Sequence, residues 1–393
     1  MSKLLLVFAF LSLLVGTATA TTIHVPSDQM TIQNGISAAS VGDTVLVACG
    51  TYYEHDITMK SGITLRSESG NAECVIIDAE GSGRVLECAG ISDQTRVEGL
   101  TLTGGSESEG GAVWCLYSSP TFSNVVLENN IGSYGAGMFC GTSSSPTIEH
   151  CIFRHNSSVM DTCGGMVCEG GSNPILTDVM FEGNSGFGAA GMYCRDSSPV
   201  LTNVVFSDNC ASSMTSSYGG GIECRNSSPI LTRVTFEGNS ADHGAALCCW
   251  DGSNPTLSQV TISGNVASAG SAVHCANSSP VIENSIIAFN GTGQAVYCAG
   301  TSIPLLICCD VFGNAGGDWA GCIAGQYGAD GNICQDPLFC GELNADAPLS
   351  LRGVSPCAPG ASADCGLIGA WDVGCETTSA RHVTWGSMKA VYR

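Results

Sequence analysis

One offset recurs eight times in the middle of this chain: an asparagine lies ten residues after a turn proline in every copy. Successive prolines are 24 to 30 residues apart, and the segment after each asparagine absorbs this variation. A repeat with one rigid and one variable part predicts a solenoid whose variable segments form loops. The pairs are Pro120 and Asn130, Pro146 and Asn156, Pro174 and Asn184, Pro199 and Asn209, Pro229 and Asn239, Pro255 and Asn265, Pro280 and Asn290, and Pro304 and Asn314.

Each repeat alternates apolar and polar residues with a period of two, which is typical of short β-strands. The last strand of each repeat has two apolar columns, which begin at Val113 and Cys115. Because Glu223 and His274 occur between these columns, we expect the intervening position to face outward and the columns inward. Three strands per coil predict an all-β, single-stranded right-handed parallel β-helix. The cysteine column is Cys115, Cys140, Cys168, Cys194, Cys224, Cys249, Cys275 and Cys298.

The recurrent asparagine has two interpretations, and both are structural. Its side-chain amide could pair with the next asparagine along the stack, as in other stacked β structures. It could instead be present because asparagine tolerates a left-handed turn.

The 23 cysteines are also open to two interpretations. In an exported chain, cysteines ordinarily form disulfides. Stacked cysteines with parallel side chains would strain such bonds, and cysteine packs well as a small buried hydrophobe. We therefore expect mostly buried thiols in the column. Better disulfide candidates lie in the C-terminal third: Cys308, Cys309, Cys322, Cys334, Cys340, Cys357, Cys365 and Cys375.

The motifs Gly110-Gly111-Ala112-Val113 and Phe181-Glu182-Gly183-Asn184 carry a family resemblance. They resemble the repeats of the chlamydial polymorphic membrane proteins and, more broadly, the pectin-lyase-like superfamily of right-handed β-helices. The opening from Thr31 to Glu54 resembles the first coil of that superfamily, in which the tyrosine–glutamate piece is structural. The resemblance implies a fold and leaves activity open, because this fold carries many functions.

The ends of the chain predict export. Lys3, the apolar run from Leu4 to Val15 and the small residues up to Ala20 indicate a secretion signal cleaved after Ala20, although an N-terminal anchor is the alternative. A short amphipathic helix at 31–39 would plug the first coil. We expect a signal peptide at 1–20, an N-terminal cap and irregular coils at 21–109, regular coils at 110–315, closing coils and a cap at 316–376, and a linker with a basic aromatic tail at 377–393.

The tail has Trp385, Met388 and Tyr392 on one helical face and no acidic residue. It resembles the tails of other bacterial secreted β-helix proteins, and it is either a sorting or attachment signal or a peptide that packs on the stack. The net charge of −22 excludes the basic footprint of a nucleic-acid-binding protein and favours a secreted or cell-surface protein. We expect a monomer whose only membrane contact comes through export or the tail.

Enzymes on this fold build their sites where side chains of neighbouring coils converge on an outer face. The sequence lacks the grouped aspartates of polygalacturonases, the arginine context of pectate lyases and the motifs of pectin methylesterases. Its histidines look isolated from one another. We therefore predict no catalytic residue, no metal and no cofactor. The histidines considered are His55, His150, His155, His243 and His274.

The outward column contains five residues that could bind a polysaccharide or a surface protein. Their alternative role is cross-strand stacking that stiffens the sheet. The sequence favours a non-catalytic, adhesin-like structural or binding protein, and the second hypothesis is a polysaccharide lyase or glycoside hydrolase with a divergent site. The five residues are Trp114, Phe139, Tyr193, His274 and Tyr297.

Overall fold

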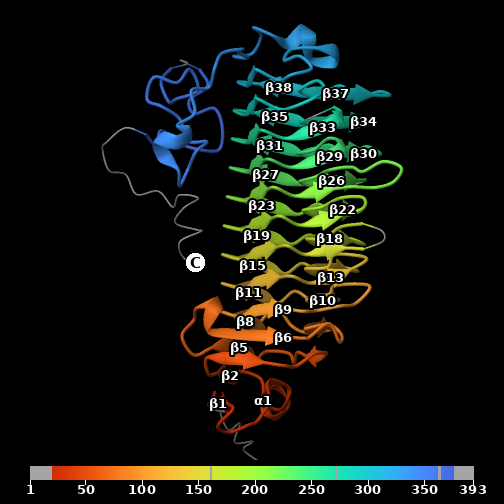
Figure 1. The fold of residues 1–393 in the computed structure, drawn as a ribbon, viewed down its shortest axis with the longest axis vertical. Helices are drawn as coiled ribbons and strands as arrows, with labels where there is room; N and C mark the ends of the chain where they lie inside the picture. The colour runs from red at the N-terminus through yellow and green to blue at the C-terminus, as the bar shows by residue number, and fades with distance from the viewer. Residues whose placement is uncertain (1–19, 160–161, 271, 362–363, 376–393) are drawn as a thin grey trace, which may run out of the picture.

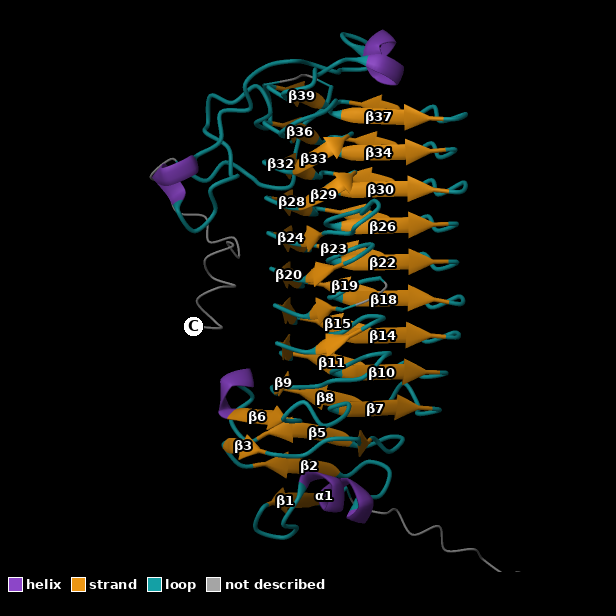
Figure 2. Cartoon of the chain, turned by 45° about the vertical axis from the view of Figure 1, so that its right-hand side comes forward, coloured by secondary structure: helices purple, strands orange, loops and turns teal. Residues whose placement is uncertain are grey.

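The computed structural model describes residues 20–159, 162–270, 272–361 and 364–375. The predicted signal peptide and the C-terminal tail lie outside the described residues, apart from Ala20. The chain winds into a long parallel β-helix with a cap at each end (Figures 1 and 2). Within the described residues, four parallel sheets run along the stack, with 12, 11, 10 and 6 strands.

Sheets A, B and C contain the three strands per coil that the repeat predicts. Sheet A contains β1 Thr22–Val25, β2 Thr44–Val47, β5 Thr64–Ser67, β8 Arg96–Glu98, β11 Thr121–Ser123, β15 Thr147–Glu149, β19 Ile175–Thr177, β23 Val200–Thr202, β27 Ile230–Thr232, β31 Thr256–Ser258, β35 Val281–Glu283 and β38 Leu305–Ile307. Sheet B contains β3 Gly50–Tyr52, β6 Val75–Asp78, β9 Thr101–Thr103, β12 Val126–Glu128, β16 Ile152–Arg154, β20 Met180–Glu182, β24 Val205–Ser207, β28 Thr235–Glu237, β32 Thr261–Ser263, β36 Ile286–Ala288 and β39 Asp310–Phe312. Sheet C contains β4 Ile57–Thr58, β7 Leu86–Ala89, β10 Val113–Leu116, β14 Met138–Gly141, β18 Met166–Glu169, β22 Met192–Arg195, β26 Ile222–Arg225, β30 Leu247–Trp250, β34 Val273–Ala276 and β37 Val296–Ala299.

Sheet D is a fourth, short sheet that the sequence did not predict, and the variable segments of the middle coils form it. Its strands are two to four residues long, so their apolar pattern is too short to recognise. Sheet D contains β13 Ile131–Gly132, β17 Ser157–Ser158, β21 Ser185–Gly186, β25 Cys210–Ala211, β29 Ser240–His243 and β33 Val266–Ala269.

The N-terminal end is closed by α1 Ile32–Ala38, which confirms the predicted helix. Thr31 caps it by accepting a 3.1 Å hydrogen bond from the backbone N–H of Asn34. The carboxylate of Glu54 accepts bonds from the N–H groups of Ile32 and Gln33, at 2.7 and 3.1 Å, so the expected structural role of this glutamate is confirmed. Among the described residues, no helix is long and apolar enough to cross a membrane.

Successive coils align their inward side chains in exact register. Val113 pairs with Met138, and Cys115 with Cys140, and both inward columns are buried as predicted. In sheet B the inward rings of four coils stack face to face, with centroids 4.6 to 5.1 Å apart. No coil buries its own face, so stacking supplies the core. The stacked rings belong to Phe153, Phe181, Phe206 and Phe236.

The asparagines form the predicted ladder. The Nδ2 atom of each donates to the Oδ1 atom of the next asparagine at 2.8 to 3.1 Å, from Asn130 to Asn314. The same Oδ1 atoms accept the backbone N–H of the preceding asparagine. Asp318 closes the ladder by accepting from Asn314 Nδ2 at 2.9 Å. Amide pairing, one of the two interpretations left open, is therefore confirmed.

Sequence reasoning missed a serine ladder at the opposite corner. A buried serine lies two residues before every turn proline. The hydroxyl of Ser118 accepts the backbone N–H of Ile91, and later hydroxyls accept the backbone N–H of the serine one coil earlier. The distance is 3.2 Å from Ser118 N to Ser144 Oγ and 3.1 Å from Ser144 N to Ser172 Oγ. The eightfold recurrence of Ser-x-Pro was the available signal. The serines are Ser118, Ser144, Ser172, Ser197, Ser227, Ser253, Ser278 and Ser302.

The cysteine column mostly holds buried thiols, and it begins at Cys88, which pairs with Cys115. This confirms the prediction of mostly buried thiols, and the exception is the last member, Cys298, which forms a disulfide with Cys322. Among the C-terminal candidates Cys308–Cys365 and Cys340–Cys375 are bonded. Three candidates remain thiols: Cys309, Cys334 and Cys357. The Cys49–Cys74 disulfide was not predicted.

Residues 97–103 lie where an early coil passes from sheet A to sheet B. The structure divides this segment into β8 and β9 because Gly99, at φ 65°, turns the chain between sheets A and B.

The C-terminal cap contains two short 3₁₀ helices rather than strands: η2 Gly321–Gln326 and η3 Gly341–Asn344. The first helix packs over β37 and β38 at the end of the stack. The chain then returns along the outside of sheet B; this segment is blue and lies beside the stack in Figure 1, and it is drawn as teal loops with a purple helix in Figure 2. The other such helix, η1 Ala72–Cys74, belongs to an early coil.

Candidate functional site

The outer face of sheet C is covered by the variable segments. In the early coils, Phe139, Val167 and Tyr193 form a small apolar cluster with Cys163 and Ala189, which come from those segments. The cluster is separate from the core, so the outward direction of the column is as predicted. The column nevertheless lies under a second layer of chain, which sequence periodicity did not reveal.

The five predicted binding residues therefore divide into two groups. Phe139, Tyr193 and His274 are only 3, 6 and 5% exposed. Trp114 is half-buried, lies under the guanidinium of Arg84 at 5.2 Å and donates from Nε1 to Glu109 Oε2 at 3.1 Å. Tyr297 is 39% exposed. Their role in binding stays a prediction, but they do not form one open surface.

A second group of rings gathers around His274, on strands β29, β30, β34 and β37 and on the variable segment that contains Tyr218. The His274 ring lies 5.1 Å from the ring of His243, 5.4 Å from Trp250 and 5.1 Å from Tyr297. Tyr218 stacks on His243 at 5.1 Å and meets Trp250 edge-on at 5.1 Å. We call these five residues the aromatic row.

The aromatic row overturns the expectation that the histidines are isolated. Residues 243 and 274 are 31 positions apart, yet β29 and β34 bring their rings into contact because sheet D lies against sheet C. Sequence reasoning also missed Tyr218 and Trp250. Trp250 lies two residues beyond the outward column in its own strand, in register with Arg225. The guanidinium of Arg225 lies 5.7 Å from the Trp250 ring centroid.

Three nitrogen atoms of the row are buried without a hydrogen-bond partner among the described residues: His243 Nδ1, Trp250 Nε1 and His274 Nδ1. Burial, together with the nearby His243, lowers the pKa of His274 to about 4. A neutral imidazole in this position offers one donor and one acceptor. Buried polar atoms normally have a partner, so unpaired ones mark a place where a ligand or water supplies it.

Two acid–base pairs lie on the same face, one coil apart. Arg195 pairs with Glu169, and Arg225 Nε donates to Glu223 Oε1 at 2.8 Å. Glu223 is only 2% exposed, and burial raises its pKa to about 7 against the opposing effect of Arg225. Burial also raises the pKa of Tyr193, which is in register with Glu223, to about 12. Two carboxylates and two guanidinium groups therefore converge where the sequence predicted no such set.

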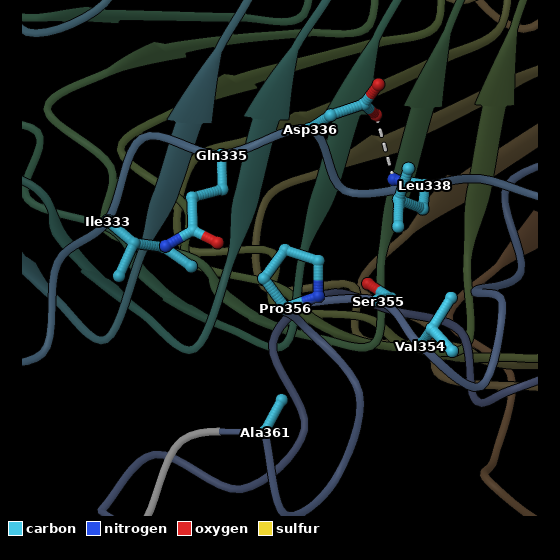
Figure 3. Close-up of a pocket in the computed structure, with 8 residues that line it drawn as sticks. All are labelled: Ile333, Gln335, Asp336, Leu338, Val354, Ser355, Pro356 and Ala361. Carbon is cyan, nitrogen blue, oxygen red and sulfur yellow. Dashed lines mark hydrogen bonds between the residues drawn. The ribbon is translucent and has the colours of Figure 1, made fainter.

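The cap contains a depression of about 480 Å³, shown in Figure 3. Its polar groups already serve the cap: Asp336 accepts from the N–H of Leu338 at 2.9 Å, and Ser355 donates to the carbonyl of Pro337 at 2.6 Å. Behind it, buried Asp310 contacts Cys357 Sγ at 3.2 Å. Burial raises the pKa of Asp310 to about 6. These contacts join the cap to the last coil.

One group of side chains has metal-ligating types close together: Cys49, Glu68 and Cys74. Both sulfur atoms are joined in a disulfide, and Glu68 Oε1 accepts from the N–H of Cys49 at 2.8 Å. A disulfide offers no thiolate to a metal ion, so we assign this group to holding the early coils together.

A family model described as right handed beta helix region matches residues 34–214 and 187–332. The chain therefore belongs to the right-handed β-helix family, which confirms the predicted fold and its handedness. The narrower likeness to chlamydial repeats stays a prediction. A search of curated proteins finds no match.

A solved structure supports the same fold. The chain is similar to pectate lyase Pel9A, with a TM-score of 0.57 and 13% identity over 91% of this chain and 98% of that one. Weaker similarities are to the PL6 family alginate lyase AlyGC (TM-score 0.43, 13% identity, 74% and 51% covered) and to PfbA, a surface adhesin of Streptococcus pneumoniae (0.32, 10%, 72% and 84%). At these identities the first comparison gives the architecture alone.

Proposed function

We propose that the chain is an extracellular β-helical binding protein and that the aromatic row contacts a polysaccharide. The observation that carries this proposal is the contact of five rings around buried, unpaired imidazole nitrogens. Sugar rings pack their C–H faces on aromatic side chains, while their hydroxyls need nearby donors and acceptors. The partly buried rings supply apolar faces in a row along the stack, and the hydroxyl of the exposed Tyr297 offers a donor and an acceptor. Binding of this kind involves no cleavage of the polysaccharide.

The extracellular part of the proposal is supported by four disulfides in the described residues. Disulfides persist in oxidising compartments and are rare in the cytosol. The net charge of −22 keeps such a rod soluble and separate from its copies. A neutral or weakly charged glycan fits this surface better than a polyanion, because the whole body repels negative charge.

A glycan array and retention on insoluble polysaccharides test the proposal. The variants Trp250→Ala and Tyr297→Ser remove rings from the row, and Tyr53→Ala removes an exposed aromatic ring near the opposite end of the stack. We expect a ligand for the parent, at least tenfold weaker binding by Trp250→Ala, corresponding to about 1.4 kcal/mol, and no change for Tyr53→Ala. Since Tyr297 is exposed, Tyr297→Ser preserves the core and separates lost binding from misfolding. No binding by the folded parent, or equal binding by all variants, would refute the proposal.

The second candidate is a polysaccharide lyase or hydrolase, and the pairs Glu169–Arg195 and Glu223–Arg225 favour it. A carboxyl group with a pKa near 7 suits proton transfer at neutral pH, and Tyr193 lies in the adjacent strand position. Against it, Glu223 is buried and bonded to Arg225. Release of reducing ends or unsaturated products from an acidic glycan panel, abolished by Glu223→Gln, would establish this function in place of simple binding.

A further inference from the structure

A column of apolar side chains follows the outer face of sheet B, on the opposite side of its strands from the core. Val126, Ile152, Met180 and Val205 occupy equivalent positions in β12, β16, β20 and β24. We call these four residues the outer strip. With coils about 4.8 Å apart, it is about 14 Å long. The strip forms an apolar cluster of its own, apart from the main core.

The outer strip is covered within a single chain. Its four side chains are 1 to 4% exposed. Among the described residues, Ala72 joins the cluster, and Trp371 is the partly buried apolar side chain that packs against it. One tryptophan cannot shield apolar groups spread over four coils. Since the burial is that of one chain, another part of the same chain must cover Ile152 and Met180.

The cap points toward these two residues. Gly369 N donates to Asn284 O at 2.7 Å, Ala370 N to Thr261 Oγ1 at 2.9 Å, and Trp371 Nε1 to Thr235 Oγ1 at 2.9 Å. Thr261, Thr235 and Val205 are successive members of the same outer column. The chain thus crosses the sheet toward the first coils, one strand at a time, along the line on which the outer strip continues.

The chain continues for 18 residues beyond Cys375, which a disulfide fixes to Cys340. Even as a helix, 18 residues span about 27 Å, which exceeds the distance of about 19 Å over four coils from Trp371 to Val126. This segment has the apolar residues Trp385, Met388, Val391 and Tyr392. Beside the strip lie Glu128, Arg154 and Glu182, in register in β12, β16 and β20. Arg154 pairs with Glu128, so these three side chains leave one net negative charge for the basic residues of the segment, which are Arg381, Lys389 and Arg393.

We propose that residues 377–393 dock on the outer strip of their own chain, with their aromatic and methionine side chains on Ile152 and Met180. The tail is then an intramolecular strap that extends the path of Trp371. Docking and attachment of the tail to another partner exclude each other, because both use the same apolar side chains. A partner that recognises the tail must therefore first displace it from sheet B.

Oxidation of methionine by peroxide tests this docking, since Met180 lies in the strip and oxidation depends on access. The chain from Thr21 to Glu376 keeps Cys375 and lacks the tail. We expect Met180 to be protected in the chain from Thr21 to Arg393 and to lose that protection in the shorter chain. Two methionines are internal controls: Met214 is fully exposed and Met192 lies in the core. Their rates should be the same in both chains.

Two additions keep the test decisive. The full chain with Trp385→Ala and Tyr392→Ala should behave as the shortened one, and a synthetic peptide of residues 377–393 should restore protection to the shortened chain. If Met180 stays protected without the tail while Met192 reports an intact core, docking is wrong. Protection of the shortened chain that rises with protein concentration would assign the strip to a second copy and also overturn the proposal.

Discussion

The regular stack and the C-terminal cap solve the same problem by different means. In the stack, equivalent residues of neighbouring coils hydrogen-bond to one another, as the side-chain amides do in the ladder from Asn130 to Asn314. The cap has no repeating neighbour. It is held by Cys308–Cys365 and Cys340–Cys375 and by single contacts such as Asp310 with Cys357. The stack is thus stabilised by repeated contacts between coils, and the cap by disulfide bonds.

This difference predicts where damage spreads. A solenoid is stabilised by contacts between nearest neighbours, so a defect in the middle weakens both flanking interfaces. The cap contacts the stack mainly along one sheet face and one end. A defect in the cap should therefore remain local, whereas one in the ladder should affect the whole rod.

The largest effect is expected for Asn209→Ala in the middle of the ladder. Asn209 Oδ1 accepts from the backbone N–H and Nδ2 of Asn184, and its Nδ2 donates to Phe181 O. Alanine leaves these buried groups unpaired, at about 1 to 3 kcal/mol each, so the free energy of unfolding should fall by about 5 kcal/mol. Urea unfolding followed by circular dichroism measures this loss.

The matched control is Asn173→Ala, at an exposed turn of the same stack. Its side chain bonds Gly171 O and Ser198 N, which water reaches. Unfolding free energy should change by less than about 1 kcal/mol. An equal fall in the free energy of unfolding of the two variants would mean that the buried ladder stabilises the protein no more than an exposed turn does.

Removing one cap disulfide, in the double variant Cys308→Ser and Cys365→Ser, should have the second largest effect. The bond closes a loop with a sequence separation of 57 residues, for which the chain-entropy model gives about 4 kcal/mol. Hydrogen exchange should show faster exchange in 321–375 and unchanged protection in strands β10 to β34. Equal deprotection of the stack would show that cap and stack unfold as one unit.

Titration of Glu223 gives a smaller effect, within the stack. Burial raises its pKa from 4.5 to about 7, so its contribution to stability is complete below pH 4.5 and is lost as the pH rises through 7. The loss is at most about 3 kcal/mol. Glu223→Gln should remove it, so the variant should gain thermal stability relative to the parent at pH 8 and not at pH 4.5.

His274 provides the opposite sign. Its lowered pKa, about 4 against 6.5, contributes stability that is present above 6.5 and lost as the pH falls through 4. His274→Gln should therefore flatten the acid side of the profile, whereas Glu223→Gln flattens the neutral side. Thermal unfolding of both variants between pH 3.5 and 8 separates the two groups. Identical profiles would contradict the assigned burial of either residue.

Sequence alone predicted the stack because identical residues recur at a fixed offset. The proline–asparagine spacing located sheets A and B, and the apolar columns located sheet C. It did not predict that the variable segments fold over sheet C, because their lengths and residues differ between coils. For this reason the sequence predicted that Tyr193 and Glu223 point outward but not that a second layer of chain buries them.

The candidate site depended on that same missing layer. His243 meets His274 only because a variable segment lies against sheet C, which no local pattern encodes. Trp250 reaches His274 from the adjacent strand of sheet C. The cap disulfides were likewise predictable as a set of cysteines and not as pairs. The bond from Cys298 to Cys322 joins a regular column to the cap, so neither region's pattern alone predicts it.

The smallest effect on stability is expected for the free thiols, which differ strongly in their expected reactivity. Burial raises the pKa of Cys140, and hydrogen bonding to Cys115 together with burial raises that of Cys88. Reaction requires an accessible thiolate. Of the 15 free cysteines, Cys210 in sheet D is exposed and Cys334 in the cap is partly so. In native protein we therefore expect one thiol to react rapidly with a chromogenic disulfide reagent.

Cys210→Ser should abolish the rapid reaction and leave the unfolding free energy nearly unchanged, because the side chain packs against nothing in the core. Cys334→Ser should remove only a slower phase, and urea should release all the remaining thiols together if the stack unfolds cooperatively. Several fast thiols in the folded parent would mean that column cysteines reach solvent. The coils would then open individually, and the contacts between coils would stabilise the stack less than the disulfides stabilise the cap.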